Sequence, residues 1–455
     1  MPAKKHFWQT GLLNLIVQLV LLVLVYFLGN SINISIASPG SYLLITFITF
    51  IPSVLWALFF YFQDKKTPEP LPSLFASFGI GIAAAVIVFM PIVTYIFKLQ
   101  DWLYGDMRYF LLGSLFIYAP LIVVLFYAVI RIVFYPMPDF DEPIDGMIYG
   151  SFMGAGFALA KAVVQIVGAG DVTVFYGVYT ASVHTILYAS LGAMIGYFIG
   201  ISKFNKKRIE KNALYAITFG ILIVSAYQFI NEYIFMSGVE YAFELSFLLS
   251  IVYGLIILGW CYFEMHKLSL SDEFKHSKAK PGLERAAIGV LLITLVAGIM
   301  LTSVALRVRY FEDAGAGISF SYSPYFSKLG SFGTVPDTVT GALLFSADGN
   351  NVRILCMRAD RSEPNAGEPS GTAIGLRSPE DITINGQPAK RYLYAYLSNN
   401  GDGLPELYWV YHDVVRSNDE IFVFMYSAQP AQFDLMLHYY EQLLKTVHFR
   451  TGEVK

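Results

Sequence analysis

Polar side chains inside long apolar segments are the residues of this sequence with the strongest potential for chemistry. Such groups are costly in a bilayer, so they are functional candidates by default. A histidine or lysine in such a place can hold or move a proton, and a histidine can also bind a metal ion. The candidates are Asn14, Gln18, Lys161, Gln165, His184, Gln228, Asn231 and Glu232.

The spacing of these residues does not describe an active site by itself. Metal sites need several convergent ligands, and no apolar segment carries HExxH, paired cysteines, Glu-x-x-His or two carboxylates one turn apart. There is also no phosphate-binding loop and no G-x-S-x-G motif. A lone histidine such as His184 is more often a hydrogen-bonding group between helices than a ligand, and the amides Asn14 and Gln18 favour the same structural role.

Two glycine rows indicate how the helices around these residues pack. Gly146, Gly150 and Gly154 recur every four residues in one apolar segment, and Gly192, Gly196 and Gly200 do so in the next. Small residues at this spacing share a helix face and allow two backbones to approach closely. We therefore predict a tight pair of helices, with Lys161 and His184 placed to face one another.

The composition predicts a polytopic α-helical membrane protein. Of 455 residues, 56% are hydrophobic and 14% are charged, whereas soluble domains carry about 25% charged residues. Nine segments are long enough to span a bilayer. They are 9–29, 42–62, 73–98, 109–135, 144–168, 174–201, 213–236, 242–263 and 286–307. Basic loops alternate with loops poor in lysine and arginine, which predicts a cytoplasmic N-terminus and a C-terminus outside the cell.

The chain is expected to have four parts: an N-terminal anchor span (1–40), a helical membrane domain (41–265), a cytoplasmic loop with the ninth span (266–307), and a small extracytoplasmic α+β domain (308–455). In the last part, alternation over 391–397, 407–415 and 421–426 predicts strands. Asn385-Gly386 predicts a hairpin turn, and 431–447 has helical spacing. The two cysteines imply no disulfide framework, which is typical of a bacterial plasma-membrane protein.

Four short motifs give the membrane portion a resemblance to a known family. They are Tyr61–Asp64 followed by Pro68–Pro70, Ala119–Leu121, Asp141–Gly146 with Tyr149-Gly150 and Gly154–Ala158, and His184 followed by Gly192. Over roughly residues 40–265 the chain resembles the PrsW family of intramembrane proteases. The C-terminal part is similar to PsbP/Mog1-type domains through ISFSY (318–322) and YYEQLLKTVHF (439–449).

The resemblance implies intramembrane proteolysis by glutamates and histidines that bind a metal or activate water. This sequence departs from the family pattern at those positions. Val123 and Val124 stand in place of two glutamates, Tyr127 in place of a lysine, Lys161 and Ala162 in place of a glutamate–asparagine pair, and Tyr227 in place of a histidine. His184 is the family position that is kept. The metal ligands are therefore lost, and no cofactor is expected.

Our leading interpretation is a PrsW-family protein without peptidase activity that binds or scaffolds membrane proteins. It requires the aligned positions to lie around one cavity, where Tyr127 or Tyr227 could give Lys161 a hydroxyl partner, with Glu232 and Asp171 as further candidates. Asn231 and Asp145 are additional polar candidates for that cavity. Predicted partners are the lipid bilayer and single-span membrane proteins, and no nucleic acid.

Two alternatives stay open. One is an active protease in which Lys161 is the base for a serine or threonine nucleophile, with Ser151, Ser182 and Thr185 available. The other is a membrane sensor or transporter, which would be indicated by an internal repeat or broken helices in matching halves.

The acidic loop before the fifth segment is expected to have a structural role rather than a catalytic one. Asp141, Glu142 and Asp145 are typical of a solvated loop with a helix cap. Glu69, between two prolines, is expected to shape a turn.

Overall fold

A computed structural model describes most of the chain, and it divides into two compact units. One unit comprises residues of 1–98 and 111–300, and the other residues of 99–110 and 301–455. The described residues are 20, 33–34, 39–62, 69–103, 107–169, 172–204, 209–236, 242–269, 282–313, 318–323, 326–329, 339–347, 352–359, 374–398, 406–417, 420–428 and 430–449.

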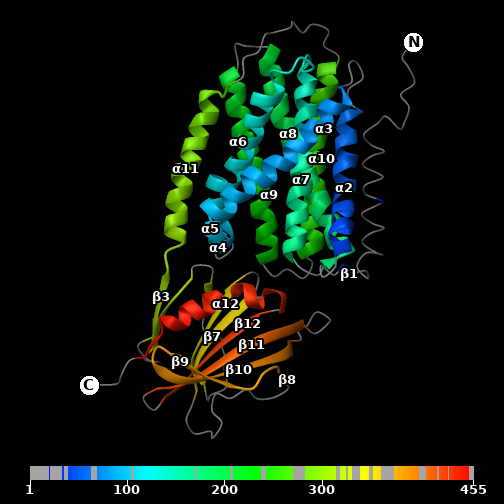
Figure 1. Cartoon of the computed structure of the whole chain (residues 1–455). Helices are drawn as coiled ribbons and strands as arrows, with labels where there is room; N and C mark the ends of the chain where they lie inside the picture. Colours follow the sequence, from blue (N-terminus) through cyan, green and yellow to red (C-terminus); the bar gives the residue numbers. More distant parts are fainter. Residues whose placement is uncertain are drawn as a thin grey trace. The chain divides into compact units, whose positions relative to one another are not determined.

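The first unit is a bundle of long apolar helices (Figure 1). The helices of this part of the chain are α2 (Pro39–Tyr61), α3 (Leu71–Ala83), α4 (Leu99–Trp102), α5 (Met107–Gly113), α6 (Ala119–Val129), α7 (Pro143–Ala169), α8 (Val174–Phe204), α9 (Ile209–Met236), α10 (Ala242–Ser269) and α11 (Arg285–Ala305). Of these, α4, the first part of α5 and the end of α11 are grouped with the second unit. Strands β1 (Asn33–Ile34) and β2 (Val172–Thr173) pair beside them.

Seven helices of the described residues are long and apolar enough to cross a membrane. They are Leu71–Ile96, Met107–Phe134, Pro143–Val167, Val174–Phe204, Ile209–Ile234, Leu248–Met265 and Arg285–Ala305. They coincide with the last seven predicted segments, so a multi-pass membrane protein is confirmed. The segment predicted at 42–62 is the helix α2, whose apolar part Thr49–Tyr61 is shorter. The predicted span 9–29, with Asn14 and Gln18, lies outside the described residues.

Two of these spans contain π-helical turns next to prolines. The span after Pro70 passes through Ala84–Phe89 and Ile92–Ile96 on either side of Pro91. The next span has Ser114–Tyr118, which ends two residues before Pro120, and a further π-helical turn at Ile130–Phe134. Proline has no N–H to donate, so a wider turn re-pairs the carbonyls that an α-helix would leave unsatisfied in hydrocarbon.

The helix α7 lies at the centre of the unit, with α2, α3 and α8 packed around it (Figure 1). Against α8, the glycine rows place backbone on backbone: a Cβ added at Gly150 would clash with the carbonyl oxygen of Gly192, and one at Gly192 with that of Gly150. The predicted tight pair is therefore confirmed. On another face, Gly156 meets the Phe78 carbonyl of α3 in the same way.

Contacts between loops show which of them share a side of the bundle. Asn33 pairs with Thr173, which joins the first and fifth loops. Ser73 in the first turn of α3 donates to Asp139 in the loop before α7 over 3.2 Å, and the N–H of Arg285 at the start of α11 donates to Glu210 at the start of α9 over 3.4 Å, so the members of each pair lie on the same side of the bundle. These contacts join connections that are an even number of helices apart, as expected for helices that cross the bundle in alternating directions.

The second unit is strand-rich. Its strands are β3 (Arg309–Asp313), β4 (Ile318–Tyr322), β5 (Ser327–Leu329), β6 (Val339–Ala347), β7 (Val352–Ala359), β8 (Ile374–Gly375), β9 (Glu380–Ile384), β10 (Gln387–Ser398), β11 (Glu406–Ser417), β12 (Glu420–Ala428) and β13 (His448–Phe449), with helix α12 (Pro430–Lys445). The main sheet has the order β5-β6-β7-β12-β11-β10-β8, with β9 also on β10, and β13-β4-β3 forms a smaller sheet. Every pairing is antiparallel.

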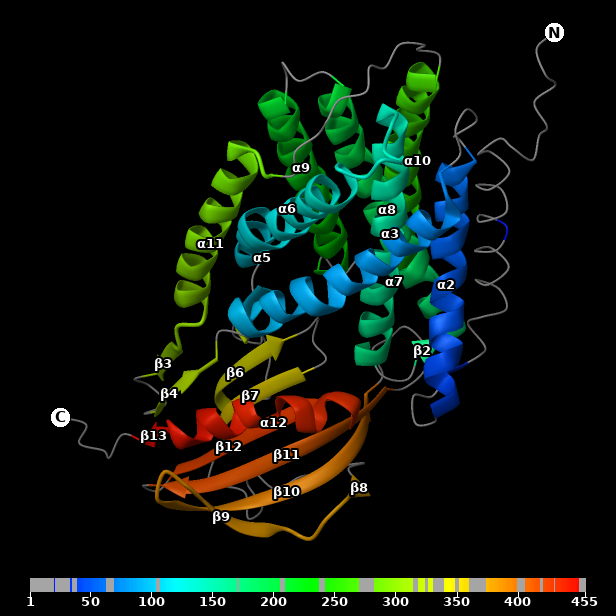
Figure 2. The same cartoon turned by 45° about the horizontal axis from the view of Figure 1, so that its top comes forward.

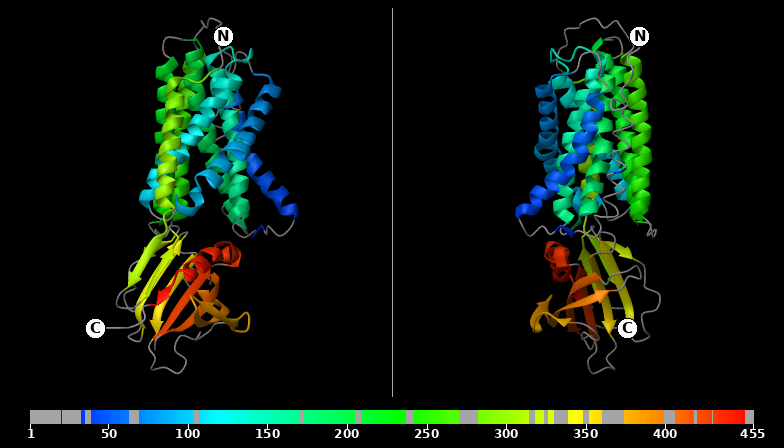
Figure 3. Two further views of the ribbon diagram at one scale, coloured as in Figure 1. Left: turned by 60° about the vertical axis from the view of Figure 1, so that its left-hand side comes forward. Right: turned by 90° about the vertical axis from the view of Figure 1, so that its right-hand side faces the viewer.

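The predicted strands, hairpin and helix of this unit are confirmed. Asn385 and Gly386 have φ of 45° and 78° between β9 and β10, the left-handed backbone that such a two-residue turn needs. The helix α12 lies along one face of the main sheet (Figure 2, Figure 3). Its residues Phe433, Tyr440 and Leu443 are in one buried cluster with side chains of the sheet.

A buried ion pair lies under α12. Arg391 on β10 is directly opposite Asp413 on β11, and its Nε and Nη2 each donate to that carboxylate over 2.7 Å. The Tyr440 hydroxyl adds a third bond of 2.9 Å. Asp413 with its hydrogen bonds raises the pKa of Arg391, more than offsetting the effect of burial, while burial chiefly raises the pKa of Tyr440.

Residues 99–110, which join two spans, belong to this second unit. The guanidinium of Arg309 lies 5.9 Å from the centre of the Tyr109 ring, a cation–π contact between this segment and β3.

Candidate functional site

A chain of polar side chains runs between three helices at the heart of the bundle. The Lys161 ammonium of α7 lies 5.2 Å from the centre of the Tyr118 ring. The Tyr118 hydroxyl is 3.3 Å from the hydroxyl of Tyr188 on α8. One turn earlier on α8, the His184 ring packs edge-on against Tyr188, with 5.8 Å between centroids. Lys161 also acts electrostatically on His184, and the two are linked through the Tyr118 and Tyr188 contacts; that they face one another stays a prediction.

Aromatic rings enclose this chain. Phe157 on α7 packs against Tyr188, Phe89 and Phe126, with ring centroids 5.0 to 5.4 Å apart. Phe89 and Phe126 are buried. Charges act more strongly in such apolar surroundings than in water, so the sign of each group near His184 matters for what it binds.

Among the described residues, no acidic side chain hydrogen-bonds to His184 or acts on it electrostatically. Its Nδ1 is buried without a hydrogen-bond partner in the same part of the chain. Tyr188 is in ring contact with it, Tyr118 is bonded to Tyr188, and the cation Lys161 acts on it electrostatically. This set can donate hydrogen bonds and attract negative charge, and it has no carboxylate that could serve as a base.

The positions aligned with the family's first motif lie on α6 and are apolar or engaged elsewhere. Val123 and Val124 are buried, and the γ carbons of Val123 face Gly220 on α9. The Tyr127 hydroxyl donates over 2.5 Å to Glu284, at the start of α11. The expectation that Tyr127 pairs with Lys161 was wrong, because Glu284 is a nearby carboxylate.

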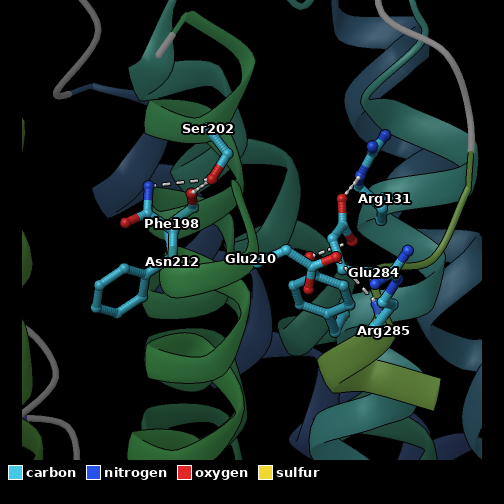
Figure 4. A network of polar contacts seen from close by, with 8 residues as sticks. Arg131, Phe198, Ser202, Glu210, Asn212, Glu284 and Arg285 are labelled. Carbon is cyan, nitrogen blue, oxygen red and sulfur yellow. Dashed lines mark hydrogen bonds and ion pairs between the residues drawn. The ribbon is translucent and has the colours of Figure 1, made fainter. Parts of the chain in front are cut away.

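Glu284 holds a second partner at this end of the bundle. The Nε of Arg131 donates to it over 2.7 Å, and the two side chains are only 10% and 5% exposed. Figure 4 shows Arg131 and Glu284 pointing toward one another, with Glu210 beside the backbone of Arg285. The guanidinium of Arg131 also covers the ring of Tyr135, 3.8 Å from its centre. Burial raises the pKa of Tyr135, and the nearby Arg131 partly offsets this.

Tyr227, the aligned position of a family histidine, belongs to a separate hydroxyl cluster. Its hydroxyl is 2.5 Å from that of Ser250 on α10, and its carbonyl accepts from the Asn231 amide over 2.9 Å. Ser246 donates to Asn231 and lies 2.9 Å from the Tyr179 hydroxyl. Tyr227 therefore has its own hydroxyl partner and is not the partner of Lys161, contrary to expectation. The ammonium of Lys161 instead lies against the ring of Tyr118, whose hydroxyl is paired with Tyr188.

In the acidic stretch that leads into α7, Asp139 is exposed and Asp141 and Glu142 are half-buried, so the solvated-loop prediction was wrong only for Asp145, in the first turn of α7. Asp145 is 0% exposed, and its Oδ2 accepts from the Glu142 N–H over 2.5 Å, so its capping role is confirmed. Its Oδ1 has no donor among the described residues and faces Glu69. Glu69 is 5% exposed and accepts from the Tyr149 hydroxyl. Asp145 and Glu69 are thus both buried at this end of the bundle.

Lys203, at the end of α8, binds the backbone of the loop before α7. Its ammonium donates to the carbonyl oxygens of Tyr135 and Phe140 over 2.7 and 2.5 Å. It thereby holds the loop between the fourth and fifth predicted spans. The aligned position next to Lys161, Ala162, is fully buried and offers no polar group.

Comparison with known proteins shows a similarity over much of the helical unit. The family model described as PrsW family intramembrane metalloprotease matches residues 69–259. Residues 69–259 are therefore similar to the PrsW family. The Protease PrsW of Bacillus subtilis (strain 168) is 28% identical over 167 residues, covering 35% of this chain and 70% of that protein. The Protease PrsW of Oceanobacillus iheyensis is 26% identical over 185 residues, covering 39% and 79%.

The second unit has a much weaker likeness. The solution structure of cyanobacterial PsbP from Synechocystis sp. PCC 6803 aligns with 32% of this chain and 93% of its own, at 14% identity. The TM-score of 0.24 is too low for this likeness to carry an argument.

The PrsW description names a metal, and the residues near His184 do not fit one. Within the described ranges there is no group of three His, Cys, Asp or Glu side chains placed to hold a metal ion. An ammonium at Lys161 repels a dication, and phenols that are hydrogen-bonded to each other are poor ligands. No step of a metal reaction can be derived from this set.

Sequence reasoning missed three of the residues that organise these sites. Tyr118 had no signal beyond being a tyrosine in a span. Glu284 and Lys203 were read as parts of charged loops. The one sequence signal for Glu284 was its place just before the helix start predicted at 286, because side chains just before a helix often fold back and contact their neighbours.

Proposed function

We propose that this chain is a PrsW-family membrane protein that has lost peptidase activity and binds membrane-spanning helices of other proteins. The observation that carries the proposal is the set of groups around His184: the cation Lys161 and the phenols Tyr118 and Tyr188, without a carboxylate among the described residues. Water activation by this family chemistry needs a base or a metal. The groups around His184 are the same however each motif position is aligned with the family.

The active-protease alternative gains no support from the candidate nucleophiles. The Ser151 hydroxyl donates to the Ile148 carbonyl over 2.8 Å, and that of Thr185 to the Ala181 carbonyl over 2.7 Å. These bonds to their own helices are typical of structural hydroxyls in spans. Ser182 is buried on α8. No contact of Lys161 with any of the three occurs in the described structure.

We further propose that the second unit lies outside the cell. Support comes from residues 99–110, which pack with it and belong to a loop whose basic residue is Arg108. Cytoplasmic loops are those enriched in lysine and arginine. Cysteine labelling of residue 399 or 452 in intact cells by an impermeant reagent, in a variant with Cys261 and Cys356 replaced by alanine, tests this orientation.

The activity proposal is tested with the full chain in lipid vesicles and labelled single-span peptides. We expect no cleavage by mass spectrometry, and no change on His184→Ala. The Bacillus subtilis relative named Protease PrsW, assayed in parallel, shows that the conditions support such proteolysis. Cleavage by this chain that disappears in His184→Ala would overturn the proposal.

A further inference from the structure

Lys161 is a cation within a membrane span, and its ammonium does not reach out to the membrane interface as lysines near helix ends usually do. It precedes Val167, the end of its span, by six residues, or about 9 Å along the axis at 1.5 Å per residue. Lysines near helix ends usually extend their ammonium to the interface. Here the ammonium lies over Tyr118, the twelfth residue of the 28-residue span Met107–Phe134. It therefore points toward the middle of the bilayer.

An inward-pointing ammonium needs negative charge in hydrocarbon. No carboxylate of the described residues forms an ion pair with Lys161. Asp171, the sequence candidate, lies outside those residues. Lys161 thus has a ring beside it, and a cation–π contact supplies only part of the stabilisation that a carboxylate would give.

The groups next to Lys161 can donate hydrogen bonds to the oxygen atoms of a ligand. The Nδ1 of His184 is buried and has no hydrogen-bond partner within the described structure. In the tautomer with a proton on that nitrogen it is a donor. The ring of Tyr118 is beside Lys161, the ring of Tyr188 is beside His184, and the two hydroxyls are 3.3 Å apart. One cation and several donors in an apolar setting match the two oxygens of a carboxylate.

The approach to Lys161 is open on the lipid side. Lys161 is half-buried, while Val164 (49% exposed) and Gln165, three and four residues later, are exposed on the same face of α7. Residues at these spacings lie one turn apart on one helix face. A polar amide and a lysine thus share the exposed outer part of a span, where a second helix can pack.

We propose that Lys161, with His184 beside it, binds the carboxylate of an Asp or Glu side chain in the membrane-spanning helix of a partner protein. The occupant is chosen by charge: the site is cationic, and a helix is the structure that can bring a carboxylate to this depth in hydrocarbon. This inference rests on the proposed function and names the partner class that the site selects.

Full-length protein in neutral phosphatidylcholine vesicles, with fluorescent single-span peptides, tests the inference by energy transfer. Three peptides differ at one position about 9 Å from the outer end of the helix, where they carry Glu, Gln or Leu. We expect the Glu peptide to bind about tenfold more tightly than the Gln peptide, since tenfold corresponds to about 1.4 kcal/mol, which is within the range of a desolvated charge pair.

Three variants test whether the preference for the Glu peptide depends on Lys161. Lys161→Met removes it, and Lys161→Glu transfers it to a peptide with Lys at the same position. Lys211→Met is the matched control, because Lys211 lies at the start of α9 near Tyr215, and it leaves the preference intact. Equal binding of the Glu and Gln peptides by the wild type, or a preference that survives in Lys161→Met, overturns the inference.

The same samples separate this inference from the proposed function. Mass spectrometry of the recovered peptides shows whether any was cut. Cleavage without loss of the Glu preference overturns only the claim of lost peptidase activity. Absence of both cleavage and preference overturns only the carboxylate site.

Discussion

Close packing of α3 on α7 leads to a sharp prediction for two glycines of α3. A Cβ added at Gly81 would lie 2.0 Å from the carbonyl oxygen of Met153, whereas one at Gly79 meets nothing within 4 Å. Ordinary contact starts at 3.4 Å, so Gly81→Ala requires a separation of 1.4 Å (3.4 minus 2.0) between the two helices. The obstacle is backbone and cannot rotate away.

The expected difference between the two variants follows from this geometry. Overpacking typically costs about 1–3 kcal/mol, and a backbone obstacle places Gly81→Ala at the upper end. Both substitutions gain up to about 1 kcal/mol in helix propensity, which cancels in the comparison. We therefore expect the free energy of unfolding of Gly81→Ala to be about 3 kcal/mol below that of Gly79→Ala. The bond of 2.7 Å from Ser77 to the Tyr149 carbonyl, at the same interface, would be strained as well.

The two buried free cysteines provide the assay. Cys261 lies in α10 and Cys356 in β7, and both are shielded from solvent. In a Cys356→Ala background, a thiol-reactive dye reports unfolding of the helical unit through Cys261 during detergent or heat titration. Equal midpoints for Gly81→Ala and Gly79→Ala would refute the close approach of α3 and α7.

Three further predictions concern buried polar groups. Glu284→Ala leaves Arg131 buried without its carboxylate, so the helical unit should lose about 3–5 kcal/mol in the same assay, and less in Glu284→Gln. Asp413→Ala should destabilise the strand-rich unit by a similar 3–5 kcal/mol, read through Cys356 in a Cys261→Ala background, and an unchanged midpoint would contradict the ion pair. The pKa of Tyr440 is raised above its usual value of 10, chiefly by burial, so its stabilisation is complete below pH 10 and is lost as pH rises further. Stability should fall above pH 10 in the wild type and fall less steeply in Tyr440→Phe, as measured by dye reaction across that range.

The features that could be predicted from sequence are those encoded by local periodicity. The glycine rows at four-residue spacing predicted the α7–α8 contact, and Asn385-Gly386 predicted a turn because few other residues adopt φ of 45° and 78° in succession. Alternation of polar and apolar residues predicted three strands of the second unit. In each case the cause lies within a few residues of chain.

The features that were missed depend on distant partners. Glu284 meets Arg131 across 153 residues, and no local pattern distinguishes a buried charge from one in a solvated loop. Asp145 was expected in water because carboxylates usually are, but Glu69, Lys203 and the packing of α7 enclose it. Gly156 shows the same limit: its four-residue neighbours are not glycines, so only the structure reveals its contact with Phe78.

The membership of residues 99–110 in the second unit changes how that unit is attached. The chain passes between the two units at three points: after Lys98, after Phe110 and after Met300. A domain on one flexible linker is released by a single cut, whereas here a cut after Met300 leaves residues 301–455 packed against a segment that the bundle still carries, through contacts such as Arg309 on Tyr109. Any force on the strand-rich unit is thereby delivered to the ends of two further spans, at Ile96 and Met107.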